Sequence, residues 1–399
     1  EAGAAYAIID DPSAQIDERT ILVEDSLKAL QLLACHHRQQ LGIPVIAITG
    51  TNGKTTTKEL TAAVLSGRGA VCRTAANYNN EVGLPLTLLG ITAEDTAAVV
   101  ELGMRGMGQI AALACVAAPH IAIVTNVCEV HMELLGSIEN IARAKAELVK
   151  AIPAGGTVIL NADDARVAAM RSLAAGGVRV LTYGISAEAD VRAEALRCRA
   201  DGSQFMVTWA NERHDYAIPL AGRHNVSNTL AALAAGFVLG RTPQEMQAGL
   251  AHLTASKMRY EVYEVGAWRF INDAYNASPA SMRVALDTTA ALYAGRRIAV
   301  LGDMLELGTA AEEAHREIGR QVAARGFAAL VTYGAQAHWI YEAAEAAGCP
   351  VCYHAGTHEA AAAFLRTILT EGDTVLFKGS RGMRMEKVIT ALMGEEAGH

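Results

Sequence analysis

A glycine-rich run around Lys54 is the part of the sequence that most directly predicts chemistry. Residues 45–57 read VIAITGTNGKTTT, an apolar segment followed by a turn that contains Gly50 and Gly53. The backbone N–H groups of such a turn bind phosphate oxygens, and the positive end of the following helix strengthens the attraction. Lys54 is placed to reach the β- and γ-phosphates, and the Thr55 hydroxyl to bind Mg²⁺. The run therefore predicts a nucleotide-binding site.

The same run departs from the most general phosphate-loop pattern. That pattern asks for a glycine five residues before Gly53, where this chain has Ile48. The sequence fits a shorter variant instead, G-T-x-G-K-T. The alternative is an ordinary strand-to-helix turn that contains these residues by chance, but the apolar strand before it and the helix after it favour the nucleotide site.

Two polar residues at the ends of apolar segments are candidate metal ligands. Glu101 lies at the end of segment 97–102, and a carboxylate at the carboxyl end of a parallel strand borders the crevice where ligands bind. It is suited to hold Mg²⁺, although an ordinary surface acid would give the same pattern. His131 follows segment 121–127, where a neutral imidazole could complete a metal shell or be only a hydrogen-bonded loop residue.

Lys145 is the third candidate, because it lies on or beside the apolar face of a predicted helix over residues 137–152. Most lysines in such a place extend the ammonium group to water. A buried lysine with a lowered pKa could instead react with CO₂ and become a carbamate, which resembles a carboxylate and can bridge metals. The residues alone leave both interpretations open.

The elements that must position these residues alternate between strand and helix. Short apolar strands alternating with helices are typical of a doubly wound, mostly parallel sheet. Polar–apolar alternation around a turn at Asp201-Gly202 predicts a hairpin that interrupts this order. The expected strands are 45–49, 97–102, 121–127, 157–161 and 178–183, and the expected helices are 55–66, 137–152, 225–239 and 243–253.

The α/β alternation restarts after an expected hinge at residues 256–258. Ser278 and Pro279 suit the N-cap and the first position of another helix. Strands are expected at 298–301, 329–333, 351–353 and 374–377. We therefore expect a partial N-terminal domain over residues 1–41, a central domain over 42–256 and a smaller α/β domain over 257–399.

Length and composition exclude several classes of protein. The chain has 399 residues, and 34 basic against 42 acidic side chains give a formal net charge of −8. Such acidity argues against general nucleic-acid binding, and no apolar run is long enough to insert into a membrane. Seven cysteines without paired spacing favour reduced thiols and a cytoplasmic location. The N-terminal residues do not read as a signal peptide.

Several motifs together resemble the Mur ligase family over about residues 1–395. The first set is GTNGKTTTK, NYNNEVGLP, VELG, TNVCEVH, ARAKAEL and GRHNVSN, starting at residues 50, 77, 100, 125, 142 and 222. The second set is NDAYNASP, VLGDMLELG and KGSRGM, starting at residues 272, 300 and 378, and is similar to members that add D-alanyl-D-alanine. The resemblance implies a central doubly wound P-loop ATPase domain and a Rossmann-like C-terminal α/β domain.

The resemblance also implies a reaction, the ATP-dependent joining of UDP-N-acetylmuramoyl-tripeptide to D-alanyl-D-alanine (D-Ala-D-Ala). ATP would phosphorylate the terminal carboxylate of the tripeptide, and the amine of D-Ala-D-Ala would attack the acyl phosphate. Two anions must meet in this reaction, which requires cations between them. The implied cofactors are ATP, two Mg²⁺ ions and a carbamylated Lys145. We expect a monomer that neither binds nucleic acid nor inserts into a membrane.

Transferred motif by motif, the resemblance implies roles for particular residues. Catalysis is expected to depend on Lys54, Glu101, His131 and Lys145, and metal binding on Thr55, Glu101, His131 and Lys145. The nucleotide is expected to contact Gly50, Thr51, Asn52, Gly53, Lys54, Thr55, Thr56, Asn225, Asn228, Arg259, Asp273 and Tyr275. The substrates are expected to contact Asn77, Asn79, Asn80, Asn126, Asn276, Lys378, Ser380 and Arg381.

Two departures from the family pattern leave other interpretations open. The region before the phosphate loop is shorter than the family's UDP-binding domain, and Met258 stands where a glycine usually precedes Arg259. A ligase of the folylpolyglutamate or cyanophycin type, or a nucleotide-binding form without ligase activity, is therefore an alternative. Tyr275 and Asn276 could simply shape a turn, and Arg381 could pair with a surface acid.

Overall fold

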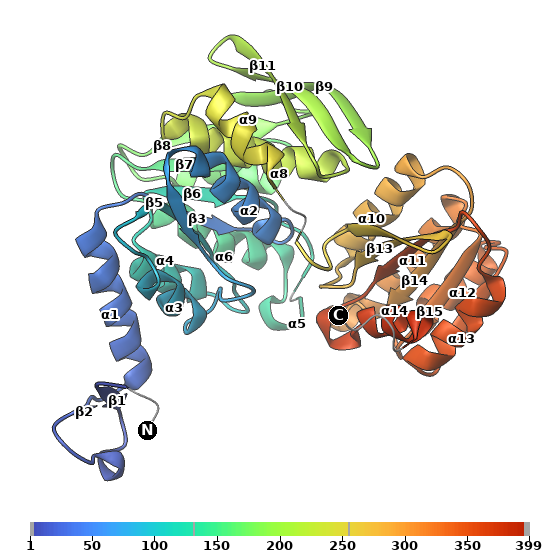
Figure 1. The fold of residues 1–399 in the computed structure, drawn as a ribbon, viewed down its shortest axis with the longest axis horizontal. Coiled ribbons are helices and arrows are strands. Elements are labelled where there is room, and N and C mark those ends of the chain that lie inside the picture. The colour runs from blue at the N-terminus through green and yellow to red at the C-terminus, as the bar shows by residue number, and fades with distance from the viewer. Residues whose placement is uncertain (1–3, 131, 254–255, 395–399) are drawn as a thin grey trace.

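The computed structural model describes residues 4–130, 132–253 and 256–394. Two α/β bodies lie side by side, and a helix near the N-terminus projects away from both (Figure 1). A nine-stranded sheet lies at the centre of the first body, and a six-stranded sheet at the centre of the second. The expected α/β fold class is confirmed.

The first sheet is mainly parallel. Its strands are β3 (Val45–Thr49), β4 (Ala70–Arg73), β5 (Asp95–Glu101), β6 (Ile121–Val124), β7 (Thr157–Asn161), β8 (Arg179–Gly184), β9 (Val191–Arg199), β10 (Gly202–Trp209) and β11 (Glu212–Ile218). Their spatial order is β11-β10-β9-β8-β7-β6-β3-β5-β4, with parallel pairing from β9 to β4. Strands covered on both faces are apolar throughout, and every residue of β3 is buried.

Helices cover both faces of this sheet, as a doubly wound fold requires. Ile46 and Ile48 of β3 pack toward α2, α8 and α9, whereas Val45 and Ala47 pack toward α1, α3, α4 and α6. Alternate residues of one strand thus enter two different cores. The helices are α1 (Ser26–Leu41), α2 (Lys54–Leu65), α3 (Gly83–Leu89), α4 (Gln109–Ala117), α5 (Met132–Leu135), α6 (Ile138–Lys150), α7 (Ala165–Ala169), α8 (Arg223–Val238) and α9 (Pro243–Ala251).

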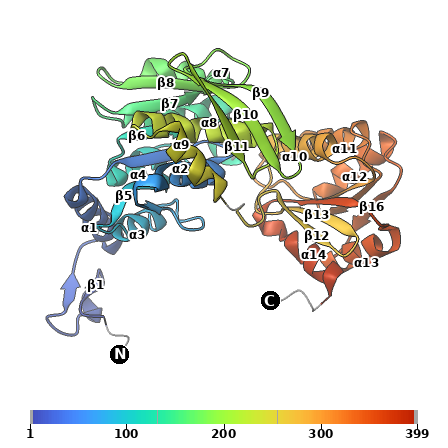
Figure 2. The same cartoon turned by 45° about the horizontal axis from the view of Figure 1, so that its top comes forward.

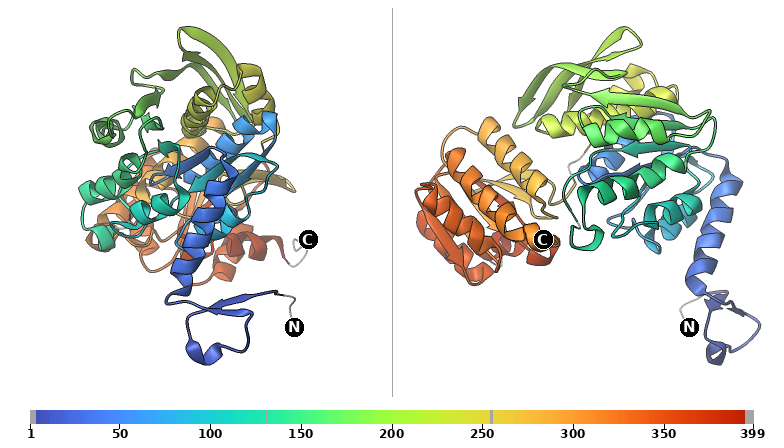
Figure 3. Two further views of the ribbon diagram at one scale, coloured as in Figure 1. Left: turned by 90° about the vertical axis from the view of Figure 1, so that its left-hand side faces the viewer. Right: turned by 180° about the vertical axis from the view of Figure 1, so that it is seen from behind.

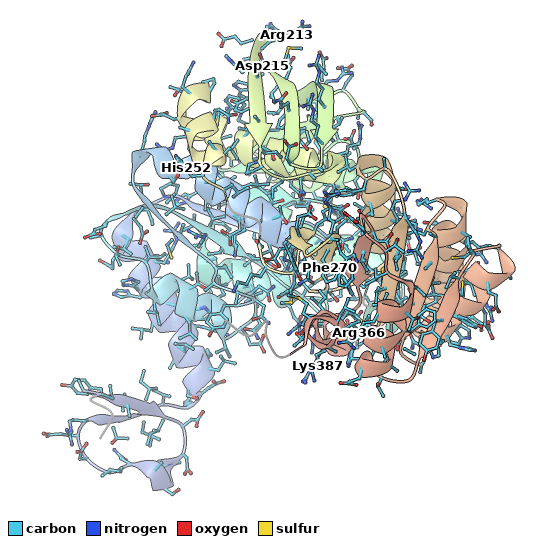
Figure 4. All side chains as sticks on the ribbon, turned by 45° about the vertical axis from the view of Figure 1, so that its right-hand side comes forward. Arg213, Asp215, His252, Phe270, Arg366 and Lys387 are labelled. Atoms are coloured by element: carbon cyan, nitrogen blue, oxygen red, sulfur yellow. The ribbon has the colours of Figure 1, made fainter. Side chains whose placement is uncertain are left out.

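The strands β9, β10 and β11 extend the sheet in antiparallel order (Figure 2). The expected turn at Asp201-Gly202 joins β9 to β10, and Gly202 has a φ of +155°. Arg213 and Asp215 project from the outer edge of this extension, well away from the second body (Figure 4). The extension therefore enlarges the first body on the side remote from residues 1–41.

The second body has the sheet order β12-β13-β17-β14-β15-β16, in which only β12 runs antiparallel to its neighbour. Helices α10, α11 and α12 pack on one face, and α13 and α14 on the other. The strands are β12 (Glu261–Val265), β13 (Trp268–Asp273), β14 (Arg297–Gly302), β15 (Ala329–Tyr333), β16 (Cys352–Ala355) and β17 (Thr374–Lys378). The helices are α10 (Pro279–Leu292), α11 (Ala311–Ala324), α12 (Ala337–Ala346), α13 (His358–Ile368) and α14 (Glu386–Met393).

Residues ahead of the phosphate loop form a small separate unit. The strands β1 (Ala7–Ile9) and β2 (Thr20–Leu22) pair in parallel and lead into α1, which points away from the first body (Figure 3). Helix α1 is anchored by Gln31, which donates to the carbonyl of Glu81 at 3.1 Å, by the buried Ala34, and by Arg38, which donates to the carbonyl of Ala117 at 3.0 Å. Short 3₁₀ helices lie at Pro12–Ala14, Ser66–Arg68, Met170–Leu173, Gly308–Ala310 and Arg381–Met383.

All seven cysteines are free thiols, as their spacing predicted. In the described part of the chain, no helix has both the length and the hydropathy needed to cross a membrane.

Candidate active site

The phosphate loop lies between the end of β3 and the start of α2, with the backbone shape that the sequence predicts. Gly50 and Gly53 have φ angles of +149° and +80°, a region that favours glycine. A Cβ atom on Gly50 would lie 1.8 Å from the Thr125 hydroxyl, so no side chain fits there. Gly53 is the N-cap of α2, and the first N–H groups of that helix are free to bind an anion.

A second loop, after β6, holds the phosphate loop in this shape. The side-chain oxygen of Asn126 accepts the N–H of Asn52 at 2.8 Å, and its amide nitrogen donates to the Asn52 carbonyl at 3.0 Å. The Thr125 hydroxyl donates to the same carbonyl at 2.7 Å, and the Asn126 carbonyl accepts the N–H of Thr51 at 2.9 Å. The Asn126 side chain, expected to contact substrate, is thus occupied by the loop.

Lys54 folds back over the phosphate loop. Its ammonium group donates to the carbonyls of Gly50 at 3.0 Å and Thr51 at 3.1 Å. Burial lowers the pKa of Lys54, the Glu101 carboxylate opposes this shift, and the charge of Arg259 adds to it. The cation is therefore held at the loop by two neutral carbonyls, which an anionic ligand could replace.

Thr55 and Glu101 bring two oxygens together beside the loop. The Thr55 hydroxyl donates to Glu101 Oε2 at 2.8 Å, and Asn79 Nδ2 donates to Glu101 Oε1 at 2.9 Å. Arg259, from the second body, donates to the same Thr55 hydroxyl at 2.9 Å. A hydroxyl and a carboxylate oxygen are ligands that Mg²⁺ accepts, and Mg²⁺ commonly takes its other ligands from water and phosphate. Among the described residues, no three His, Cys, Asp or Glu side chains are arranged to hold a metal.

Lys145 lies in α6 with its side chain only 2% exposed. Burial holds the pKa of Lys145 well below its usual range, and the charge of Lys54 lowers it further. The Lys145 amine is thus a desolvated group inside the first body. It does not line the cleft that contains Lys54 and Glu101. His131, the other expected metal ligand, lies outside the described residues.

The loop that carries Asn77, Asn79 and Asn80 adjoins the Glu101 carboxylate. Asn79 binds that carboxylate directly, and its carbonyl accepts the N–H of Gly103 at 2.8 Å. The side chain of Asn80 accepts the N–H of Gly83 at 2.8 Å, at the start of α3. The three asparagines therefore border the cleft, but Asn79 and Asn80 also hold their own loop in place.

The first turn of α8 closes the other side of the phosphate loop. A Cβ atom on Gly53 would lie 2.5 Å from Asn228 Oδ1, and Asn225 accepts a 3.4 Å hydrogen bond from the Asn228 amide. His224 precedes Asn225 directly, one turn before Asn228, and burial lowers the pKa of His224 to about 4. His224 lines the cleft as well, a role for which sequence reasoning had not selected it, although the run GRHNVSN contains it.

The second body presents Arg259 at the phosphate loop. The guanidinium carbon lies 4.0 Å from the centre of the Tyr275 ring, so the ring and the Thr55 hydroxyl together fix the side chain. Met258 has a φ of +58°, a conformation that favours glycine. This explains why a glycine suits the position before the arginine, and why this chain bears local strain there.

Asp273 and Lys378 form a buried ion pair at 2.5 Å on the second body's side of the cleft. Lys378 also donates to the carbonyl of Asn276 at 3.0 Å, which fixes the turn before α10. The Ser380 hydroxyl accepts the N–H of Leu305 at 2.9 Å. Arg381 pairs with Glu386 at 2.8 Å, which is the alternative to substrate binding that its sequence position left open.

These groups surround one cleft of about 1100 Å³ between the two bodies. It brings together nearly all of the predicted site residues from both halves of the chain. Gly50 and Lys145 do not line it. Besides His224, it includes residues that sequence reasoning did not select, among them Gln31, Arg105 and Ser278. Ser278 is the N-cap of α10, and its hydroxyl donates to Asn52 Oδ1 at 3.4 Å, so it is a second contact across the cleft.

Comparison with known proteins agrees with this arrangement. Residues 48–236 match the Mur ligase middle domain, and residues 258–381 match the Mur ligase, glutamate ligase domain. A Bacillus subtilis protein named UDP-N-acetylmuramoyl-tripeptide–D-alanyl-D-alanine ligase is 37% identical over 98% of this chain and 86% of its own length.

Two solved structures are also similar. MurF from Acinetobacter baumannii is 31% identical with a TM-score of 0.88, over 97% of this chain and 84% of that one. MurF ligase from Thermotoga maritima, solved in complex with ADP, is 27% identical with a TM-score of 0.87, over 98% of this chain and 88% of that one.

Proposed function

The chain belongs to the Mur ligase family, and on that basis we propose that it joins D-Ala-D-Ala to UDP-N-acetylmuramoyl-tripeptide in an ATP-dependent amide ligation. The names of its relatives support the substrates. The observation that carries the chemistry is the meeting of Lys54, Thr55, Glu101 and Arg259 at one phosphate loop, with groups from both bodies.

The reaction takes place in two steps, phosphorylation of a carboxylate and formation of an amide bond. An oxygen of the tripeptide's terminal carboxylate attacks the γ-phosphorus of ATP, the bond to the β-phosphate oxygen breaks, and ADP leaves. The amine of D-Ala-D-Ala then attacks the acyl carbon and loses a proton. The resulting tetrahedral intermediate expels phosphate, which carries away one oxygen of the original carboxylate.

Cations near the phosphate loop lower the barrier to the first step. The carboxylate and the triphosphate repel each other. Positive groups that stabilise the negative charge on the transferring phosphoryl group therefore contribute most to the rate. Lys54 leaves its two loop carbonyls to bind phosphate oxygens, and Arg259 reaches the γ-phosphate from the second body. Asn225 and Asn228 contact the adenine, and Asp273 the ribose, while Asn80 and the adjoining asparagines bind the tripeptide carboxylate.

Thr55 and Glu101 are the residues that would hold Mg²⁺, which neutralises phosphate charge when bound. The Thr55 hydroxyl oxygen and Glu101 Oε2 lie 2.8 Å apart, close enough for both to be ligands of one small cation. A second Mg²⁺ would be held by His131 and by Lys145 as its carbamate. In forming it, the neutral Lys145 amine attacks CO₂, a nitrogen–carbon bond forms and one proton is released.

We infer that the chain divides into an N-terminal segment over 1–41, a central ATP-binding domain over 42–256 and a C-terminal domain over 257–399. A cytoplasmic location is supported by the seven free cysteines. The monomeric state stays a prediction.

A phosphate-release assay with a matrix of substrates tests the proposal. We expect release only when ATP, UDP-N-acetylmuramoyl-tripeptide and D-Ala-D-Ala are all present. Equal release with L-glutamate or diaminopimelate as the amine would contradict the acceptor, and release with a folate in place of the tripeptide would support a folylpolyglutamate-type ligase. No release with any combination, while ADP still binds, would indicate a nucleotide-binding form without ligase activity.

A further inference from the structure

Lys58 is a buried cation that the proposed reaction does not use. It lies in α2 one turn after Lys54, and it is 1% exposed. A buried ammonium group loses its hydration and is retained at a cost unless other groups compensate. An apolar side chain would fill this place in the core without that desolvation cost. The contacts of the ammonium group therefore need an explanation.

The ammonium group of Lys58 connects the phosphate helix to the end of β4. It donates to the backbone carbonyl of Thr74 at 2.5 Å and pairs with Glu59 at 2.8 Å. Glu59 in turn pairs with the exposed Arg73 at 2.8 Å, so its carboxylate has a second cation. Arg73 can therefore replace Lys58 as the partner of Glu59, but among these groups only Lys58 donates to the Thr74 carbonyl.

Thr74 passes this constraint to Glu101. Thr74 is fully buried, its N–H donates to the Val99 carbonyl at 3.1 Å, and its hydroxyl accepts the N–H of Glu101 at 3.0 Å. Five residues further on, Asn79 donates to the Glu101 carboxylate. The backbone and the carboxylate of Glu101 are thus both held by the segment 74–79, which Lys58 ties to the helix of the phosphate loop.

We infer that Lys58 is a positioning residue, which sets the distance between the Glu101 carboxylate and the Thr55 hydroxyl so that one divalent cation fits both. The inference rests on the proposed role of Glu101 in holding Mg²⁺. Without Lys58 the segment 74–79 would shift relative to α2, and the two oxygens would separate. Metal affinity would then fall although neither ligand had been changed, as happens when the hydrogen-bonded supports of metal ligands are removed.

Mn²⁺ binding in the presence of ADP, followed by electron paramagnetic resonance, tests this without relying on turnover. We expect Lys58→Met to weaken Mn²⁺ binding about 10- to 100-fold. Binding of ADP in EDTA should change less than about 2-fold, because the loop and the start of α2 are intact. Lys58→Arg, which keeps a cationic donor, should restore most of the affinity.

Arg73→Met is the matched control, because it removes the other cation from Glu59 and leaves the Thr74 carbonyl untouched. It should bind Mn²⁺ as the unchanged protein does. If Lys58→Met does not fold, Thr74→Val interrupts the same connection at the hydroxyl that supports Glu101, and should weaken Mn²⁺ binding in the same way.

Glu101→Gln separates failure of this inference from failure of the proposed site. If Glu101→Gln weakens Mn²⁺ binding but Lys58→Met and Thr74→Val do not, the positioning role is wrong and Lys58 is only structural. If Glu101→Gln itself binds Mn²⁺ normally, the proposed metal role of Glu101 is wrong, and the inference fails with it. Weakening in Glu101→Gln and in the folded Lys58 or Thr74 variant, with Arg73→Met unaffected, supports both.

Discussion

At the scale of single residues, Lys145 decides whether the site uses a carbamate. Burial and the charge of Lys54 hold its pKa well below the usual range, so its neutral, CO₂-reactive amine is more abundant near neutral pH. We expect Lys145→Ala to reduce phosphate release about 10- to 100-fold, and short carboxylic acids such as acetate to restore part of it.

Lys150→Ala is the control for Lys145, because Lys150 lies at the exposed end of the same helix. It should keep full activity, and acetate should have no effect on it. A Lys145→Ala protein that folds and keeps full activity, or that no carboxylic acid restores, would count against the carbamate.

His224 makes stability depend on pH. Burial lowers its pKa from 6.5 to about 4, so between these values the unfolded chain binds a proton that the folded protein excludes. Stability is therefore lost as the pH falls from about 6.5 to about 4, by up to about 3 kcal/mol. Urea unfolding at several pH values measures this slope.

We expect the slope to become shallower in His224→Gln, whereas His252→Gln should leave it unchanged. His252 is exposed on the surface of the first body (Figure 4). An identical slope in His224→Gln and in the unchanged protein would show that another group causes the acid sensitivity.

Some site residues could be predicted from their place in the chain alone. Lys54, Thr55 and Glu101 lie at a helix start or a strand end, where the sequence pattern itself marks the functional position. His224 and Ser278 could not be found this way. They reach the cleft because α8 and α10 begin beside it, and only the tertiary fold brings those helix starts to the phosphate loop.

At the scale of elements, the two glycine N-caps of α2 and α4 make a matched pair. Gly53 and Gly108 have φ angles of +80° and +81°, but only a Cβ on Gly53 would meet a neighbour, Asn228 Oδ1 at 2.5 Å. Either substitution by alanine should cost about 1–2 kcal/mol of stability for the left-handed backbone. Only Gly53→Ala should also weaken ADP binding, because it displaces Asn228.

Thermal unfolding and ADP titration of the two variants test this pair. Equal ADP affinity in Gly53→Ala and Gly108→Ala would mean that the phosphate loop tolerates a side chain at its last glycine.

Strands with continuous apolar runs were predictable, and β3, β7 and β15 have the expected limits. The strand β4 was missed because two of its four residues are exposed, the other two are only partly buried, and the segment shows no periodicity. The helix α3 was missed because Gly83 and Pro85 resemble helix breakers, whereas the first turn of a helix tolerates proline. Whether such a segment forms a strand or a helix depends on its burial and on the position of each residue within the element, and not on composition alone.

At the scale of the whole molecule, Arg259 is one of the residues that bridge the two bodies. We expect Arg259→Met to lower turnover about 10²-fold, since a cation that stabilises the transferred charge is lost. The nucleotide and both substrates should reduce the radius of gyration of the unchanged protein, because the bodies close over them, but should reduce that of Arg259→Met less.

Arg269→Met serves as the control, because Arg269 also lies over a ring, Tyr293 at 5.1 Å, and pairs with Glu264 within the second body. It should behave as the unchanged protein in both measurements. Equal turnover and equal scattering for the two variants would show that the bridge has no functional role. The family resemblance implied that Arg259 and Thr55 both contact the nucleotide, but their direct contact, between residues 204 positions apart, follows only from the tertiary fold.

The proposed reaction requires that the tripeptide's terminal carboxylate is phosphorylated before the amide bond forms. Its most direct test is a ligation with the two oxygens of that carboxylate labelled with ¹⁸O, followed by mass spectrometry of the phosphate and the peptide product. A reaction through an acyl phosphate leaves one ¹⁸O in each phosphate released and one in the new amide. Unlabelled phosphate, formed at the same rate as the amide, would contradict it.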